Sequence, residues 1–276
     1  MGLELDLSSE QRQNLPSGGE AFLDELSEAL DSTAIKSVLL FGSVVSGEAT
    51  EVSDIDLLVV FKDSTEDSHI RSVQERCLHL AETHLEAERT KGNQIDNRID
   101  GMTGMFRSGF VVRGNAINSG AFHSIFHTSR LAYLLAPWRT VLAAVFDSST
   151  ALYGPLITPN WEKVEHPLTR PRRELLRSLV MTLMLSISQI FYSMVSTRSI
   201  LYAMEAHKWT LYNCAFHLGD ERTESLHRAS NIVPGCRKFD RQLFDLREDP
   251  HLEIGYMRIL PIYILLVHIR TVIALR

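Results

Sequence analysis

The sequence has few cysteines and no surplus of positive charge, and both shortages limit what the protein can be. Its 276 residues include Cys77, Cys214 and Cys236, which are too few and too widely spaced for a disulfide framework or a zinc site. Lys and Arg number 28 against 34 Asp and Glu, which gives a formal net charge of -6. A mildly acidic chain is not a bulk electrostatic binder of nucleic acid or of anionic membranes. These features predict a reducing, cytoplasmic location.

The sequence also lacks a recognisable secretion signal and a long uninterrupted apolar run. Residues 1–28 are acidic and mixed, without the basic start and the apolar stretch of a signal peptide. Two later segments are rich in apolar residues, but 175–195 contains Arg177 and several Ser and Thr, and 259–269 is only eleven residues long. A membrane-spanning helix needs about 20 predominantly apolar residues. We therefore expect both segments to be buried helices of a soluble domain, and we expect no membrane partner.

The apolar pattern divides the chain into a mixed N-terminal part and a helical C-terminal part. Short apolar runs typical of buried strands occur only in the first part, at 38–41, 55–61, 94–99 and 110–113. Apolar residues at helical spacing occur along the whole chain, at 20–30, 69–88, 124–146 (with a break at Pro137), 174–196, 198–218 and 252–276. Four prolines separate the two parts. We predict an α+β fold with a mixed-sheet domain at 1–155 and an α-helical bundle domain at 160–276.

One segment of the first part carries a pattern with chemical meaning. The apolar run that ends at Phe41 is followed by Gly42 and Ser43, and ten residues later comes Asp54-Ile-Asp56 at the start of the next apolar run. Gly42 has no Cβ, so a phosphate can approach the backbone closely. Ser43 at the start of a short helix offers a hydroxyl and free N–H groups to phosphate oxygens. Gly42 and Ser43 are therefore candidate nucleotide-binding residues.

The two aspartates are candidate metal ligands. Residues two apart on a strand point to the same face, so Asp54 and Asp56 share one face while Ile55 and Leu57 point into the core. Two carboxylates on one face suit hard divalent cations such as Mg²⁺, which bridge triphosphate oxygens. The alternative interpretation is an ordinary strand–helix–strand unit with two surface aspartates. The joint occurrence of both halves of the pattern, each at a strand boundary, favours the functional interpretation.

Phe41, Gly42, Ser43, Asp54 and Asp56 together resemble the signature of the DNA polymerase beta-like nucleotidyltransferase superfamily, and in particular its small stand-alone prokaryotic domains. The resemblance covers about residues 35–61. It implies transfer of a nucleoside monophosphate from a nucleoside triphosphate, such as ATP, to an acceptor hydroxyl, with pyrophosphate leaving. It also implies a pair of Mg²⁺ ions held by Asp54 and Asp56. The helical domain would cover the cleft and select the acceptor.

The resemblance further implies a third carboxylate on a neighbouring strand, which completes the metal site and helps to deprotonate the acceptor. Asp96 and Asp100 are the candidates, on the predicted strand at 94–99 and in the turn after it. The next predicted strand, at 110–113, carries no acid. The candidate cations for the triphosphate are Arg107, Arg113, Arg130 and Arg139.

Two classes of function follow, depending on whether Asp96 or Asp100 supplies the third acid. The leading hypothesis is an active nucleotidyltransferase in which Asp96 or Asp100 completes the site. The alternative is a weakly active or inactive protein of the same fold that acts as a regulator or an antitoxin-like partner. An RNA end, a protein hydroxyl and a small molecule all remain open as acceptors, as do the preferred nucleotide and a homo-oligomer or protein partner.

Overall fold

The computed structural model describes residues 3–50, 53–85, 108–164, 170–219 and 225–275. The chain forms two compact units, one of residues 1–133 and 144–165 and the other of residues 134–143 and 166–276. The segment 134–143 groups with the helical residues, although the sequence places it within the range 1–155. The two domain ranges proposed from the sequence therefore stay a prediction, whereas the predicted α+β fold is confirmed.

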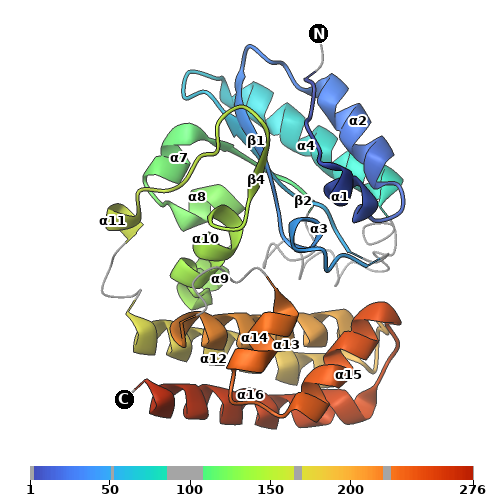
Figure 1. Ribbon diagram of the computed structural model, residues 1–276, viewed down its shortest axis with the longest axis vertical. Coiled ribbons are helices and arrows are strands. Elements are labelled where there is room, and N and C mark those ends of the chain that lie inside the picture. Colours follow the sequence, from blue (N-terminus) through green and yellow to red (C-terminus); the bar gives the residue numbers. More distant parts are fainter. Residues whose placement is uncertain (1–2, 51–52, 86–107, 165–169, 220–224, 276) are drawn as a thin grey trace. The chain divides into compact units, whose positions relative to one another are not determined.

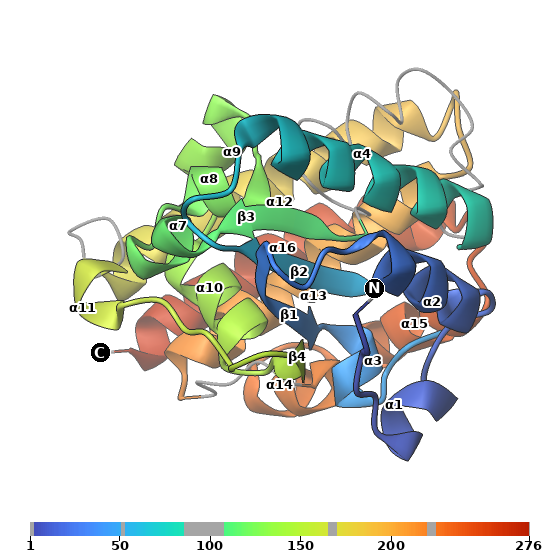
Figure 2. The ribbon, with the colours of Figure 1, turned by 90° about the horizontal axis from the view of Figure 1, so that it is seen from above.

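The first unit is built on a mixed sheet of four strands. They are β1 (Ile35–Phe41), β2 (Asp56–Phe61), β3 (Phe110–Arg113) and β4 (Thr150–Tyr153). Their order across the sheet is β3-β2-β1-β4 (Figure 2). β1 pairs antiparallel with both β2 and β4, and β3 pairs parallel with β2. Three of these strands match apolar runs seen in the sequence, and the one expected at 94–99 lies outside the described residues.

Helices cover both faces of this sheet (Figure 1). One face packs against α2 (Gly19–Ala29) and α4 (Asp67–His84), the helices expected at 20–30 and 69–88. The other lies on the side of α7 (Gly114–Asn118), α8 (Phe122–Phe126) and the end of α10 (Trp138–Phe146). Alternate residues of each strand supply the two cores. Leu57, for example, joins the α2–α4 core, whereas its neighbour Leu58 is buried on the opposite face.

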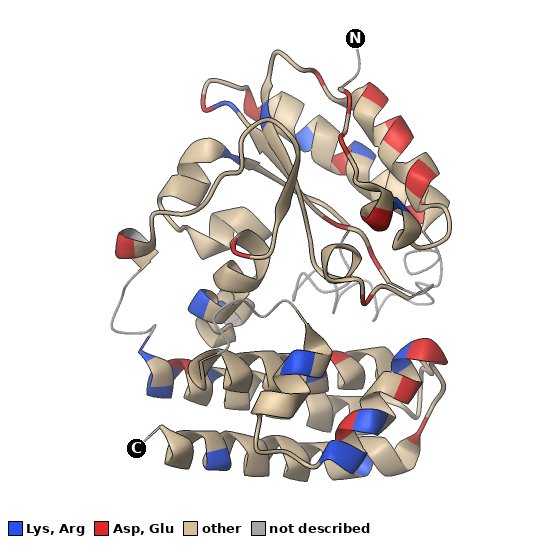
Figure 3. Cartoon of the chain, viewed as in Figure 1, with Lys and Arg blue, Asp and Glu red and all other residues tan. Residues whose placement is uncertain are grey.

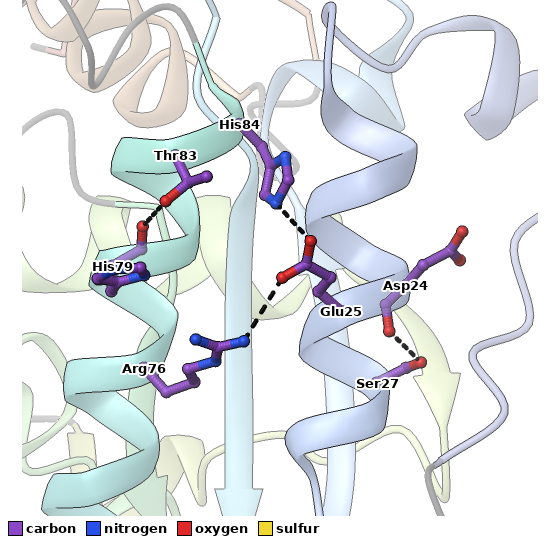
Figure 4. A network of polar contacts seen from close by, with 7 residues as sticks. All are labelled: Asp24, Glu25, Ser27, Arg76, His79, Thr83 and His84. Atoms are coloured by element: carbon purple, nitrogen blue, oxygen red, sulfur yellow. Dashed lines mark hydrogen bonds and ion pairs between the residues drawn. The ribbon is translucent and has the colours of Figure 1, made fainter.

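The helices α2 and α4 are also joined by charged side chains (Figure 4). Glu25 of α2 accepts from Arg76 of α4 at 3.4 Å and from His84 at 3.0 Å. The backbones approach closely at the same end, because a Cβ on Gly18 would lie 2.1 Å from the carbonyl oxygen of His84. Only glycine fits this position, where φ is +79°. These contacts fix α2 and α4 against each other on one face of the sheet.

The segment expected to be helical at 124–146, with one break at Pro137, is more broken than the sequence indicates. It contains α8, α9 (Arg130–Leu135) and α10, and the first break follows Phe126 rather than occurring only at Pro137. His127 adopts a left-handed conformation with φ of 49°, which ends α8. Its Nε2 lies 2.9 Å from the carbonyl oxygen of Val111 on β3, so a contact distant in sequence supports the turn.

The second unit is a bundle of α12 (Pro171–Tyr192), α13 (Ser199–His217), α14 (Leu226–Ile232), α15 (Arg237–Glu248) and α16 (Ile254–Ala274). The first, second and last correspond to the helical patterns at 174–196, 198–218 and 252–276. No helical pattern was predicted between 198–218 and 252–276, so α14 and α15 were missed. In α15, Phe239, Leu243 and Leu246 are buried at helical spacing, so the amphipathic signal was present but short.

A buried polar cluster connects the helices of this bundle. His207 of α13 lies 3.2 Å from Asp240 of α15 and 2.9 Å from the hydroxyl of Tyr256 of α16. Tyr263 donates a short hydrogen bond to the same Asp240 carboxylate, and Ser230 donates to its other oxygen. Because each group has a partner, the cluster fixes the register of four helices without leaving a buried charge unpaired.

Two helices of the second unit, α12 and α16, are long and apolar enough to cross a membrane by length and composition. The prediction that both segments are buried helices is only partly met. In the most apolar window of each helix, 28% of α12 and 39% of α16 is buried. Each packs one face inside the bundle and exposes apolar side chains on another. Pro261 lies inside α16 without ending it.

Acid is expected to weaken this unit through His268 of α16. His268 is buried, its Nδ1 lies 2.9 Å from the Ile264 carbonyl and its Nε2 lies 3.1 Å from the Ser178 hydroxyl. Burial, reinforced by the neighbouring His217, lowers the pKa of His268 from 6.5 to about 4. Between about pH 4 and pH 6.5, His268 therefore carries a proton in the unfolded chain but not in the folded chain. The stability that neutral His268 contributes is present above pH 6.5 and is lost as the pH falls toward 4, by up to roughly 3 kcal/mol.

Urea unfolding of the wild type and of His268→Gln at pH 7.5 and pH 5 measures this loss. Glutamine does not titrate and can hydrogen-bond with both partners, so the variant should lose less stability between the two pH values. The exposed His251, replaced in His251→Gln, provides the control and should behave as the wild type does. Equal losses in all three proteins would contradict the role of His268.

Candidate active site

The Gly-Ser and Asp-x-Asp halves of the sequence motif meet at one end of the β1–β2 pair. Phe41, the last residue of β1, is the register partner of Asp56, the first residue of β2. Gly42 and Ser43 follow Phe41 directly, and Ser43 opens the single-turn helix α3 (Ser43–Ser46). The antiparallel pairing therefore places Gly42 beside Asp56, although 13 residues of chain lie between them.

Gly42 is shaped to receive the Asp56 carboxylate. Its φ and ψ are 74° and -149°, a region that side-chain-bearing residues avoid. A Cβ built on Gly42 would lie 2.0 Å from Oδ2 of Asp56 and 2.8 Å from its Cγ. The carboxylate thus lies against the Cα of Gly42. The sequence analysis assigned the missing Cβ to the approach of a phosphate, but the first group to use that space is the side chain of Asp56.

The alternation of burial predicted from the sequence holds from Asp54 to Leu57, although β2 itself begins at Asp56. Ile55 and Leu57 are fully buried in the core formed with α2 and α4, whereas both aspartates are only half-buried. Because successive side chains of a strand alternate in direction, the buried pair holds the aspartates on the opposite face. Burial of each large aliphatic side chain contributes roughly 1.5–3 kcal/mol, which makes a one-residue slip of this strand costly.

The loop before Asp54 and the turn after Gly42 are held by local hydrogen bonds. Ser53 accepts at its Oγ from the N–H of Thr50, and its own N–H donates to the Thr50 carbonyl, both at 2.9 Å. After Gly42, the carbonyl of Ser43 accepts from the N–H of Glu48 at 3.0 Å, and Val44 is buried beneath the turn. The Ser43 side chain is half-buried next to Gly42. The backbone on both sides of the site is therefore ordered by the chain itself.

The strand next to the aspartates carries no acid in its described part. Leu58 of β2 pairs with Phe110 of β3, and the parallel register then places Ser108 level with Asp56. Ser108 is buried, and its Oγ accepts from the N–H of Ile55 at 3.4 Å. Sequence reasoning did not find Ser108, because nothing local to residue 108 indicates which residue of β2 it lies beside. Asp96 and Asp100, the predicted sources of the third carboxylate, lie outside the described residues.

Of the arginines considered as triphosphate ligands, Arg113 lies away from the two aspartates. Arg113 ends β3 beside Phe61, at the end of β2 opposite to Asp56. There it donates to the Thr65 carbonyl at 2.5 Å and pairs with Asp67 at 2.7 Å, which ties β3 to the start of α4. Arg139 belongs to the helical unit, where its N–H donates to Glu174. Arg107 lies outside the described residues.

The residues described here fit part of a magnesium site. Carboxylate oxygens are the ligands that Mg²⁺ prefers, and it is commonly bound through one or two carboxylates together with substrate phosphates. Asp54 and Asp56 supply two such carboxylates next to a stretch of backbone without a side chain. Within the described ranges, no group of three or more His, Cys, Asp or Glu side chains is placed to hold a metal ion.

Part of the chain is similar to a known protein family. Residues 20–100 match the family model described as nucleotidyltransferase domain. No curated protein sequence matches the chain. One solved structure that matches is the spectinomycin adenyltransferase AAD(9) from Enterococcus faecialis with ATP and spectinomycin, at 13% identity and a TM-score of 0.44, covering 91% of this chain and 98% of that one. The matched range contains Gly42, Ser43, Asp54 and Asp56, so the segment that carries the motif is similar to nucleotidyltransferase domains.

Proposed function

We propose that the protein is a Mg²⁺-dependent nucleotidyltransferase that moves a nucleoside monophosphate from a nucleoside triphosphate to an acceptor hydroxyl. The acceptor oxygen forms a bond to the α-phosphorus, the bond from that phosphorus to the β-phosphate oxygen breaks, and pyrophosphate leaves. The observation that supports this most directly is the contact of Asp56 with Gly42, which brings the two halves of the family motif together inside the matched range.

Each residue of the site has a distinct role in this proposal. Asp54 and Asp56 hold the metal, one ion or a pair. Ser43 offers its hydroxyl to a phosphate oxygen, and Gly42 leaves room for the Asp56 carboxylate. Bound Mg²⁺ would neutralise charge on the triphosphate and stabilise the leaving pyrophosphate. Asp96 or Asp100 would receive the acceptor proton and complete the site.

Calorimetry with each nucleoside triphosphate, in the presence of Mg²⁺ or of a chelator, tests the donor half of the proposal. We expect binding that requires Mg²⁺ and that is lost in the double variant Asp54→Asn/Asp56→Asn. Asp24→Asn, which removes an exposed carboxylate of α2, provides the matched control and should bind as the wild type does. Binding that is independent of Mg²⁺ and unchanged in the double variant would contradict the proposed site.

A regulator or antitoxin-like partner of the same fold is the second candidate function. The observation that favours it concerns residues 108–113, which lie beside β2 and include β3. Ser108 and Phe110, rather than an acid, lie on that side of β2 near Asp56. Such a protein would bind its partner without Asp54 and Asp56. Co-purification of a partner that persists in the double variant, together with no Mg²⁺-dependent nucleotide binding, would favour this function over the enzyme.

The acceptor remains to be identified by experiment. An RNA 3′ end, a protein hydroxyl and a small-molecule hydroxyl are the three classes to compare. The formal charge of -6, with acidic side chains along α2 (Figure 3), argues against a large nucleic-acid footprint. Transfer of label from a triphosphate labelled at its α-phosphate to one of the three classes would identify it.

A further inference from the structure

Two neighbouring helices of the second unit expose apolar side chains at regular spacing. On α12 these are Leu176, Val180, Met184, Ile187 and Phe191, with exposed fractions between 37% and 67%. On α16 they are Ile259, Ile262, Leu266, Ile269 and Ile273, with exposed fractions between 45% and 62%. The steps between successive members are three or four residues throughout. This is the spacing of helices that pack against other helices in bundles and coiled coils.

The buried side of α12 is polar, which makes its exposed apolar side unusual. Ser178, Thr182, Ser186 and Gln189 are buried. The hydroxyl of Thr182 donates to the Ser178 carbonyl at 2.8 Å, and that of Ser186 donates to the Leu183 carbonyl at 3.0 Å. The helix therefore turns hydrogen-bonded hydroxyl groups toward the inside of the bundle and turns a stripe of apolar side chains outward. In an ordinary surface helix the apolar stripe faces the core of its own domain. The outward apolar stripe of α12 is therefore typical of a surface that packs against another surface.

The two stripes form a single face of the unit. α12 and α16 run antiparallel along each other (Figure 1) and are joined by the hydrogen bond between Ser178 and His268. Both also pack against α13, so their outward sides lie next to each other. Figure 3 shows long uncharged stretches on both helices. We call the ten residues of the two stripes the α12–α16 face.

We propose that a second copy of this chain covers the α12–α16 face, so that α12 and α16 of two copies form a four-helix bundle. A large aliphatic side chain presents roughly 60–120 Å² of apolar surface when free, so ten of them at 37% to 67% exposure give this face on the order of 500 Å². The largest apolar patch of a monomeric protein is about 300–600 Å². A stable interface buries about 800 Å² on each partner. The face is thus as large as the largest apolar patches that monomers expose, and it matches the apolar share of one side of a stable interface, which is somewhat more than half of its area.

A second copy fits the face better than a lipid bilayer does. Arg258 and Arg270 are exposed on α16 and lie twelve residues, or about 18 Å, apart along the helix. A spanning α16 would place both charges within or at the edge of a hydrocarbon layer about 30 Å thick. Arg270 also donates to the carbonyl of Pro234 at 3.1 Å, inside its own unit. Packing of α12 and α16 against the same helices of a second copy, in contrast, buries only the apolar stripes. The arginines can then stay at the margin of the interface, in contact with water.

Sedimentation of the full-length chain measures its mass directly. We expect a species of twice the 31.2 kDa chain mass for the wild type, and the single-chain mass for Ile262→Asp/Ile269→Asp. Both substituted residues are exposed, so circular dichroism should show an unchanged helix content. Leu156→Asp, which charges an apolar residue of the first unit that is 53% exposed, is the matched control and should remain a dimer. Met184→Glu on α12 provides a second, single disruption and should also give the single-chain mass.

The same set of proteins gives the results that would overturn the proposal. A wild type with the single-chain mass up to millimolar concentration would overturn it, as would a dimer that persists in both face variants. Flotation with vesicles of phosphatidylcholine and phosphatidylglycerol tests the bilayer. A wild type that is monomeric in solution and floats with these vesicles, while the face variants do not, would assign the face to lipid instead. The dimer should also persist in Asp54→Asn/Asp56→Asn, so its test is independent of the proposed activity.

Discussion

Replacing Asp56 with asparagine is expected to lower nucleotidyl transfer on the order of a thousandfold while leaving the fold intact. A metal ion stabilises the charge of a phosphoryl transition state by several kcal/mol, and each 1.4 kcal/mol or so corresponds to a tenfold change in rate. Asparagine has almost the size of aspartate, so it can still occupy the space against the Cα of Gly42. Its amide is neutral and has a single acceptor oxygen, so the affinity of the site for Mg²⁺ should fall.

The measurement for Asp56→Asn is the rate of pyrophosphate release from each triphosphate with the three acceptor classes. Asp24→Asn on α2 serves as the control for the loss of one negative charge elsewhere. Thermal unfolding should show that both variants fold as the wild type does. Transfer at the wild-type rate by Asp56→Asn would rule out the proposed mechanism. If Asp56→Asn fails to fold, the same measurement is made on Asp54→Asn, because the side chain of Asp54 is not the one packed against Gly42.

The second large effect is expected at Gly42, where a single methyl group should disable the site. In Gly42→Ala the new Cβ would lie 2.0 Å from Oδ2 of Asp56, and the backbone at φ of +74° disfavours any side chain. Either the carboxylate moves away or the turn changes its conformation. We expect a loss of about 1–3 kcal/mol in the free energy of unfolding and a loss of Mg²⁺-dependent nucleotide binding.

Gly47 provides a matched control for this substitution. Its φ is +73°, but the nearest atom to its Cβ position is Nδ2 of Asn14 at 3.6 Å, an ordinary contact. Gly47→Ala should therefore lose about 1 kcal/mol of stability from its backbone conformation and keep its nucleotide binding. Urea unfolding and calorimetry on both variants separate the two effects. Equal nucleotide binding by both would show that the contact between Gly42 and Asp56 is not needed for the site.

The agreement between sequence and structure is closest where the information is local. The strand before Gly42, the turn at Ser43 and the strand after Asp54 follow from short apolar runs and from residues within about twenty positions of one another. Ile55 and Leu57 lie in the core as their alternation with Asp54 and Asp56 indicates. The functional motif could therefore be predicted from one segment of sequence, because strand alternation by itself places two carboxylates on one face.

The disagreements occur where distant segments meet. The position of Ser108 beside Ile55 depends on the parallel register of β2 and β3, and a parallel partner is reached only through a long connection. The helices α14 and α15 were missed because their apolar stripes are short and interrupted by charge. The polar side of α12 lies inside the bundle because α13 and α16 present partners such as His268 to it. Composition alone predicted a buried helix there.

The sequence by itself determined the α+β class, the Gly42–Ser43 turn and the pair of aspartates, because each of these depends on the period of a strand or on the conformational freedom of one glycine. Only the tertiary structure decided that the Cα of Gly42 receives the Asp56 carboxylate, that Arg113 is used at the far end of the sheet, and that α12 and α16 present apolar faces outward. These features arise from the register of strands and the packing of helices, which depend on contacts between residues far apart in the chain and therefore leave no local pattern to read.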